Sequence, residues 1–254
     1  MKNRHLRLTG IVIKQFSLKE ADKMVTIISP DLGKVVGVAR GVKKIKSKLA
    51  GSLELFSIGD FELIESKGLN LIVGARTSQR SYQLNQNLPK LSVAYFLAEA
   101  ADKLTDEGEP VEGLFQLFDE LLESLKDDTL SPDSLLSIVK LRLLDIFGMR
   151  PELDVCVHCR KKLTAPGNFS ISSSQGGVLC GECEQFDPAT VKTNVDEVKV
   201  MRLAVGNNIK SVARLNRANE ALSKVGAQVS RLFDYQINRH FKSSNFIEAL
   251  SRIN

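Results

Sequence analysis

CVHC at residues 156–159 and CGEC at residues 180–183 are the most informative segments of this chain, because they contain its only four cysteines. Each Cys-x-x-Cys pair places two thiolates on one tight turn, and two such turns that face each other supply four sulfur ligands in a tetrahedron. This spacing predicts a structural Zn²⁺ site held by Cys156, Cys159, Cys180 and Cys183. With four protein ligands, no coordination position remains for a substrate.

Two other uses of the cysteines fit the sequence less well. Two disulfides need an oxidising compartment, yet the N-terminal segment MKNRHLRLTG lacks the apolar stretch of a secretion signal. A thioredoxin-like dithiol needs one Cys-x-x-Cys at the start of a helix, whereas this chain has two pairs in polar, glycine-containing surroundings. His158 lies inside the first pair, but four available thiolates favour a bystander role for it.

The composition is that of an ordinary globular protein. Hydrophobic residues make up 43% and charged residues 26% of the 254 residues. No apolar run approaches the roughly 18 residues that cross a bilayer. We therefore expect a cytoplasmic protein without membrane contact, long enough for one large domain or two small ones.

Charge is sorted along the chain. Residues 1–80 contain 15 Lys and Arg against 7 Asp and Glu, a net charge of +8, whereas residues 81–150 contain 6 against 13, a net charge of −7. Residues 151–195 carry −1 and residues 196–254 carry +5. A basic N-terminal region beside an acidic one suggests a polyanionic partner for the former, although solubilising charge gives the same composition.

Short β-strand patterns recur about every ten residues up to residue 80. The expected strands are Leu8–Phe16, Met24–Ser29, Lys34–Ala39, Leu53–Ile58, Asp60–Glu65 and Leu71–Arg76. So many short strands in so few residues indicate a small closed barrel at residues 1–80, for which an OB fold and an SH3-like barrel fit equally. Phe16, Phe56 and Phe61 lie in strand patterns, so we expect them in the core.

From about residue 85 the apolar residues follow helical spacing. Candidate helices are Leu91–Leu104, Val111–Leu125, and a third that begins at the capping residue Ser131 and ends by Gly148. Apolar residues cover most of the third helix, so it must be largely buried. Helical spacing resumes in 222–237. We therefore expect an α+β protein in which a cysteine module, residues 152–188, is inserted into a helical domain, residues 81–254.

The segment 40–48, RGVKKIKSK, contains five cations and no acid. Phosphates enter such a positive field by releasing counterions, largely without regard to base sequence. The candidate DNA contacts are Lys34, Arg40, Lys43, Lys44, Lys46 and Lys48. A solvated connection explains a basic run equally well, but its place on a small barrel favours nucleic-acid binding.

The sequence offers no familiar catalytic arrangement. It contains no Gly-x-x-x-x-Gly-Lys-Ser/Thr loop, no His-Glu-x-x-His and no Gly-x-Ser-x-Gly. The His-x-Glu of zinc deaminases is absent as well. We expect a protein that is not an enzyme and has no catalytic residues.

In order and spacing, the motifs resemble the RecO family of bacterial recombination mediators in DNA repair. In the N-terminal part they are Thr9-Gly10-Ile11-Val12-Ile13, Glu20-Ala21-Asp22-Lys23, Gly33-Lys34, and Ala39-Arg40-Gly41-Val42-Lys43-Lys44 with Ser47. Further along they are the two cysteine pairs, Phe169-Ser170, Gly176-Gly177 and Arg239-His240-Phe241-Lys242-Ser243. The resemblance extends over almost the whole chain.

The resemblance implies an N-terminal OB fold, a C-terminal helical domain and an inserted zinc module. It further implies binding of single- and double-stranded DNA, annealing of complementary strands, and a cytoplasmic, nucleoid-associated location. Implied partners are RecR and the C-terminal tail of single-strand-binding protein, with RecA loaded indirectly. Because the central helices carry −7, an acidic tail would dock more favourably on the +5 block.

Two alternatives from other classes remain open. An OB barrel with a cysteine knuckle also suits an RNA-binding or ribosome-assembly factor. A protein-interaction scaffold would leave the basic segment merely solvated. Competition between RNA and DNA, and the salt dependence of binding, separate these alternatives.

Overall fold

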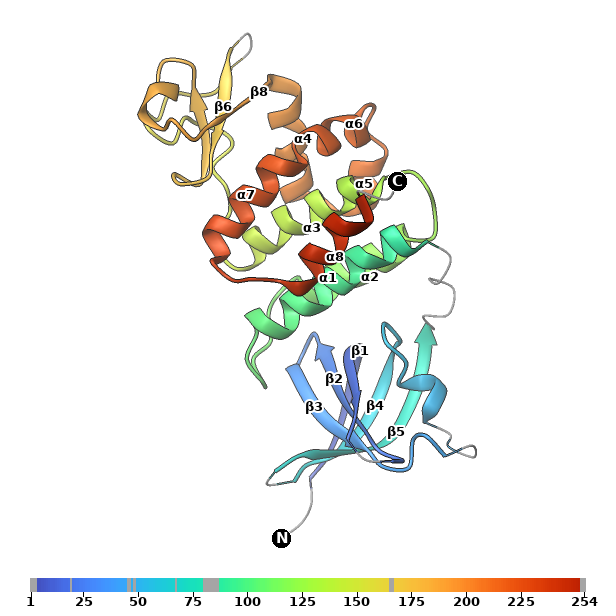
Figure 1. Ribbon diagram of the computed structural model, residues 1–254. Coiled ribbons are helices and arrows are strands. Elements are labelled where there is room, and N and C mark those ends of the chain that lie inside the picture. Colours follow the sequence, from blue (N-terminus) through green and yellow to red (C-terminus); the bar gives the residue numbers. More distant parts are fainter. Residues whose placement is uncertain are drawn as a thin grey trace. The chain divides into compact units, whose positions relative to one another are not determined.

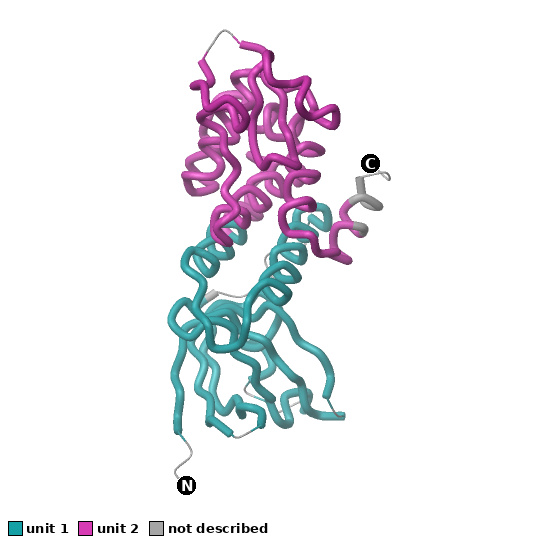
Figure 2. The backbone as a smooth tube through the Cα atoms, turned by 90° about the vertical axis from the view of Figure 1, so that its left-hand side faces the viewer, with its two compact units in different colours: residues 1–122 teal, residues 123–254 magenta. Residues whose placement is uncertain are grey.

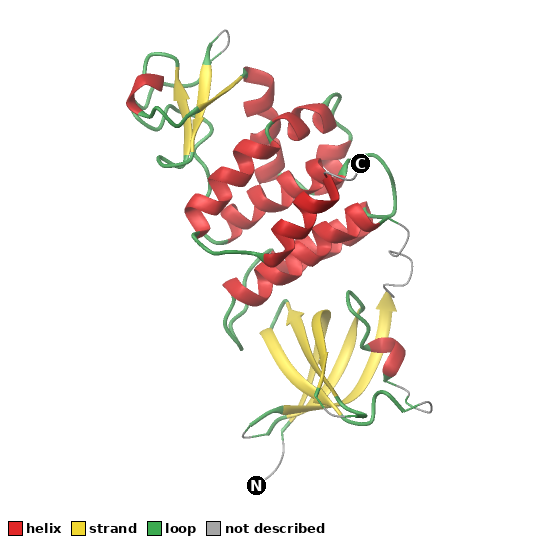
Figure 3. Ribbon diagram, in the orientation of Figure 1, coloured by secondary structure: helices red, strands yellow, loops and turns green. Residues whose placement is uncertain are grey.

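The computed structural model describes residues 4–18, 20–44, 47, 49–66, 68–79, 87–164 and 167–251. The chain divides into two compact units, residues 1–122 and 123–254, coloured separately in Figure 2. Figure 1 labels the helices and strands, and Figure 3 distinguishes them by colour. Strands dominate the start of the first unit, and helices make up most of the second.

Five strands form the barrel of the first unit. They are β1 (His5–Ser17), β2 (Lys23–Ser29), β3 (Gly33–Ala39), β4 (Ile58–Ile64) and β5 (Asn70–Gln79). The barrel closes in the order β1-β2-β3-β5-β4, with β3 and β5 parallel and the other neighbours antiparallel. This closed five-stranded arrangement is of the OB type and confirms that prediction.

The barrel core follows from alternation along the strands, because every second side chain points inward. Leu8 and Val12 from β1, Ile27 from β2, Phe61 from β4 and Ile72 from β5 all belong to this buried cluster. Apolar burial of this kind is worth about 25 cal/mol per Å².

The expected strand Leu53–Ile58 is wrong, apart from Ile58, which begins β4. The 3-10 turn η1 (Ala50–Ser52) precedes it, and Leu53 enters the barrel core. Phe56 is buried in the left-handed region at φ 64°, which no strand residue adopts. The segment is apolar because it covers the core and not because it pairs with a neighbour.

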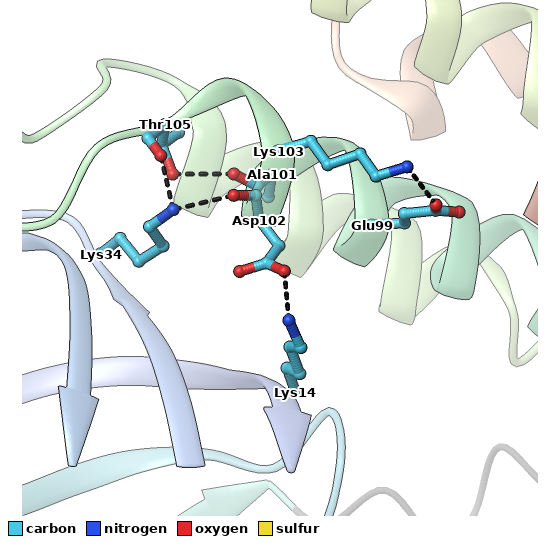
Figure 4. A network of polar contacts seen from close by, with 7 residues as sticks. All are labelled: Lys14, Lys34, Glu99, Ala101, Asp102, Lys103 and Thr105. Atoms are coloured by element: carbon cyan, nitrogen blue, oxygen red, sulfur yellow. Dashed lines mark hydrogen bonds and ion pairs between the residues drawn. The ribbon is translucent and has the colours of Figure 1, made fainter. Parts of the chain in front are cut away.

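Helix α1 (Leu88–Leu104) is tied to the barrel by Lys34 of β3. The Lys34 ammonium donates to the carbonyl oxygens of Asp102 at 2.8 Å and Thr105 at 2.5 Å (Figure 4). These carbonyls lie at the helix C-terminus, where the last turn lacks amide partners and carries partial negative charge. Lys14 of β1 adds an ion pair to the Asp102 carboxylate at 2.6 Å.

Gly33, at the start of β3, permits the close approach of the chain that follows α1. Its φ is +63°, and a Cβ atom there would lie 2.2 Å from the carbonyl oxygen of Glu109. The Gly108 amide donates to the Lys34 carbonyl oxygen at 2.9 Å. Helix α2 (Leu114–Ser124) then buries Leu117 and Phe118, among others, as its apolar periodicity predicts.

The second unit is built around α3 (Pro132–Ile146). Ser131 caps the helix by accepting from the Ser134 amide, and Gly148 follows its end at φ +74°, so the predicted limits are confirmed. α3 packs against α4 (Val195–Gly206), α6 (Ala218–Lys224) and α7 (Gly226–Ile237). The helical pattern expected over 222–237 thus belongs to two helices. The other helices of this unit are α5 (Ile209–Ala213) and α8 (Lys242–Ser251).

Between α3 and α4 the chain forms a three-stranded sheet in the order β7-β6-β8. Its strands are β6 (Phe169–Ser172), β7 (Gly177–Cys180) and β8 (Val191–Thr193), and β8 lies past the expected limit at residue 188.

Strands give way to helices between residues 79 and 88, whereas the compact units divide after residue 122. The boundary of independently folding domains at residue 80 stays a prediction.

Helices that could span a membrane, judged by length and apolarity, do not occur in the described part of the chain.

Replacing Lys34 by Met should destabilise the first unit by about 1–3 kcal/mol, because the carbonyls of Asp102 and Thr105 lose a charged donor. The control Lys14→Met removes an ion pair whose lysine side chain is 51% exposed, which is worth less than about 1 kcal/mol. Urea unfolding followed by circular dichroism measures both. Equal losses in the two variants would contradict the capping role of Lys34.

Candidate metal centre and nucleic-acid interface

Two tight turns bring the four cysteines together. In the first, the Arg160 amide donates to the Cys156 carbonyl oxygen at 2.9 Å, and Arg160 adopts φ 62°. In the second, the Cys183 amide donates to the Cys180 carbonyl oxygen at 2.9 Å. The Cys180 amide also donates to the sulfur of Cys156 at 3.4 Å, which joins the two turns.

The sulfur positions fit one tetrahedral metal ion. All four Sγ atoms lie within 4.8 Å of one another, and those of Cys159 and Cys180 are 3.7 Å apart. Four ligands at about 2.3 Å from Zn²⁺ stand about 3.8 Å from each other, whereas sulfurs in a disulfide are separated by about 2.05 Å. The arrangement therefore fits one metal ion bound by four thiolates and not two disulfides.

The pKa values of the thiols differ within the cluster. Burial and the neighbouring sulfurs of Cys180 and Cys159 together raise the pKa of Cys183 to about 12. Burial also raises the pKa of Cys156, but amide donors from Cys159 and Cys180 outweigh it and hold that pKa at about 6. Four thiolates at this spacing repel one another, so a bound cation would stabilise the full set.

His158 lies outside the sulfur cluster. Its ring stacks on Phe186 with the centroids 4.2 Å apart and an interplanar angle of 13°. The cluster of groups able to hold a metal, within the described residues, consists of the four cysteines. This is the position expected of a bystander to the metal site.

The cysteine module is attached to the helices of its own unit. Arg202 of α4 donates from Nε to the Leu153 carbonyl oxygen at 2.8 Å and pairs with Asp154 at 3.1 Å. Gln236 of α7 donates to the Ser173 carbonyl oxygen at 3.4 Å. These bonds hold the start and the middle of the module, so the sulfur cluster lies in an insertion fixed to the helices.

The basic segment leaves β3 as a folded turn. Val42 is 1% exposed and belongs to the barrel core, while Arg40, Lys43 and Lys44 are exposed. The Lys44 amide donates to the Gly41 carbonyl oxygen at 3.1 Å, and Gly41 has φ +65°, a conformation that favours glycine. The buried valine thus fixes the turn that displays three cations.

The preceding hairpin holds this turn from the other side. The Asp22 carboxylate accepts from the Gly41 amide at 2.8 Å, and the Ala21 carbonyl oxygen accepts from the Lys43 amide at 3.1 Å. Sequence reasoning placed Asp22 only in a family motif, because an acid 18 residues before the basic segment gives no sign that it bonds to the backbone there.

The other candidate cations are placed differently. Lys34 uses its ammonium on the carbonyls at the end of α1, as described above. Lys46 and Lys48 lie outside the described residues. The predicted phosphate contacts that the structure brings together on one turn are therefore Arg40, Lys43 and Lys44.

Comparison with known proteins covers nearly the whole chain. A family model described as "Recombination protein O N terminal" matches residues 1–80, and "Recombination protein O C terminal" matches residues 85–245. The "DNA repair protein RecO" of Dehalococcoides mccartyi strain CBDB1 is 30% identical over 249 residues, 98% of this chain and 97% of that protein. A Listeria monocytogenes protein of the same name is 28% identical over 243 residues, 96% of this chain and 94% of that protein.

Replacing Asp22 by Ala should speed hydrogen exchange of the Gly41 amide by about tenfold, because the carboxylate that accepts from it is lost. The control Glu20→Ala removes the same charge from an exposed neighbouring residue. The hydrogen-exchange rate of the Gly41 amide, measured by NMR in both variants, distinguishes the two substitutions. An unchanged Gly41 rate in the Asp22 variant would mean that the turn holds its conformation without this bond.

Proposed function

The chain belongs to the RecO family of DNA repair proteins, and from this premise we propose that it is a recombination mediator that binds DNA through the turn at Arg40–Lys44. The finer activities proposed are binding of single- and double-stranded DNA, annealing of complementary strands, and help in loading recombinase on coated strands. The observation that carries the proposal is a turn held by buried Val42 and by backbone hydrogen bonds, whose three cations face solvent.

Binding through this turn follows from counterion release. Each phosphate that a cation neutralises frees condensed counterions, so affinity falls as salt rises. Arg40 can hold a phosphate with two parallel hydrogen bonds, while Lys43 and Lys44 act as point charges. Because phosphate contacts carry no base information, the predicted affinity depends little on sequence.

A fixed turn also lowers the cost of binding. Side chains on a disordered loop lose backbone freedom when they bind, whereas Val42 and Asp22 already restrict this backbone. Annealing needs the same cations, because two polyanionic strands approach each other only when their charge is screened. We propose no chemical step for this protein, and its role in repair is then one of binding and assembly.

The proposed protein partners come from the family. They are RecR and the C-terminal tail of single-strand-binding protein, with RecA reached indirectly, in a cytoplasmic and nucleoid-associated setting. For an acidic tail, the +5 charge of residues 196–254 offers attraction and the −7 charge of residues 81–150 offers repulsion. The C-terminal block is therefore the proposed docking region.

Replacing Arg40, Lys43 and Lys44 by Ala should flatten the slope of log affinity against log salt for single-stranded DNA by about two units, since each phosphate contact contributes roughly 0.7. Fluorescence anisotropy at several salt concentrations, with DNA and RNA of one sequence, measures the slope and the preference. Affinity should fall similarly for every base sequence, and annealing should decline in parallel.

A matched control removes the same charge elsewhere. Lys126, Lys199 and Lys224 each pair with an acid three or four residues away, and their replacement by Ala should leave the salt slope unchanged. If the Arg40 triple variant keeps its slope and its circular dichroism spectrum, the turn is only a solvated connection. Stronger binding to RNA would favour the ribosome-assembly alternative.

We further propose that the four cysteines hold one structural zinc ion, for which sulfur ligands in tetrahedral geometry are suited. Metal analysis of the purified protein should find about one zinc per chain. Cys180→Ser should lose zinc and solubility, because formation of the site and folding of the module are coupled. The exposed neighbour Gln185 provides the control Gln185→Ser, which should keep both.

Four freely titrating thiols in metal-free purified protein would contradict the metal site. One equivalent of iron in place of zinc would keep the tetrathiolate site and overturn the identity of the ion.

A further inference from the structure

Phe16 is exposed although its sequence position points to the barrel core. Inward side chains occupy even positions in the first part of β1, at Leu8 and Val12. The register then shifts between Val12 and Lys14, because one extra residue is inserted opposite β2. Such a bulge inverts the alternation, so Lys14 and Phe16 turn outward and Phe16 is 46% exposed. The expectation that Phe16 packs in the core is therefore wrong.

The strand register places Phe16 at the end of an apolar row on the outer surface of the barrel. Phe16 pairs with Met24 of β2, Met24 pairs with Val38 of β3, and Val38 pairs with Leu71 of β5. Paired residues share one face of a sheet, and neighbouring strands are about 4.8 Å apart. Val38 lies outside the interior cluster but is only 8% exposed, so Phe16 is the exposed member of this outward-facing row.

The same hairpin supports the cationic turn. Its loop is closed by the Leu18 amide, which donates to the Asp22 carbonyl oxygen at 3.0 Å. Asp22 and Ala21 in turn accept from the amides of Gly41 and Lys43. The residues that close this loop, Leu18 and Asp22, thus connect the end of β1 to the Arg40–Lys44 turn, and both lie in the first compact unit.

We propose that Phe16 stacks on one unpaired base of single-stranded DNA while Arg40, Lys43 and Lys44 hold neighbouring phosphates. This inference rests on the proposed DNA-binding function and deepens it by assigning a contact that only single strands can make. An aromatic face beside cations is the combination that binds single strands without reading sequence, because every base has a π-face. In a duplex the faces of the bases are stacked on one another, so they are closed to Phe16.

The test uses the full chain with Phe16→Ala and Phe16→Trp. Phe16→Ala should weaken binding of a short oligothymidine on the order of tenfold, and leave binding of a duplex unchanged. The salt slope should stay the same, because stacking releases no counterions. Since the chain contains no Trp, Phe16→Trp introduces a single fluorophore that a stacked base should quench while affinity is retained.

The control Phe186→Ala removes another exposed phenylalanine, 55% exposed and in the other unit, and should not affect either substrate. If Phe16→Ala binds single strands as tightly as the wild type, and the tryptophan of Phe16→Trp is not quenched, the stacking role is overturned. The proposed function would then still stand. Equal loss for single strands and duplex would make Phe16 a structural residue. Absence of DNA binding by the wild type would overturn both proposals.

Discussion

The pairing of β3 with β5 closes the barrel through two residue pairs, Gly37 with Asn70 and Val38 with Leu71. A Cβ atom at Gly37 would lie 2.9 Å from Ile72, so this approach requires a residue without a side chain. The Asn70 side chain donates from Nδ2 to the Val36 carbonyl oxygen at 3.0 Å. Closure fixes β3, and β3 in turn positions Lys34 at one end and the cationic turn directly after its other end.

Periodic signals made most of the fold predictable from the sequence. Alternation located the five barrel strands, helical spacing and a serine cap located α3, and cysteine spacing predicted the sulfur cluster. Two predictions failed where apolar residues serve a purpose other than regular packing. Leu53 covers the barrel core from an irregular segment, and Phe16 follows a bulge. A bulge adds one residue without a compositional sign, so alternation alone cannot locate it.

Cations of similar appearance in the sequence have different physical roles. Lys34 satisfies two carbonyls at a helix end, Lys14 pairs with a carboxylate, and Arg40 faces solvent. Sequence reasoning counted these cations together, because the sequence shows the charge of a residue but not the carbonyl or carboxylate that it contacts. The +8 charge of residues 1–80 therefore overstates the charge that a polyanion can meet, and the phosphate-binding capacity has to be counted from exposed cations.

The annealing proposed for this barrel sets two opposed requirements. The barrel must screen the phosphates of two strands, yet leave the hydrogen-bonding edges of the bases free for their complement. The proposed phosphate contacts of the cations on the Arg40–Lys44 turn would meet the first requirement without touching the bases. A stacking contact meets the second, because it uses the face of a base and not its edge. An extended row of exposed aromatic rings would hold many bases apart and oppose pairing. Under the proposed stacking role, one exposed phenylalanine beside three cations would order a strand locally and release it when the complement arrives.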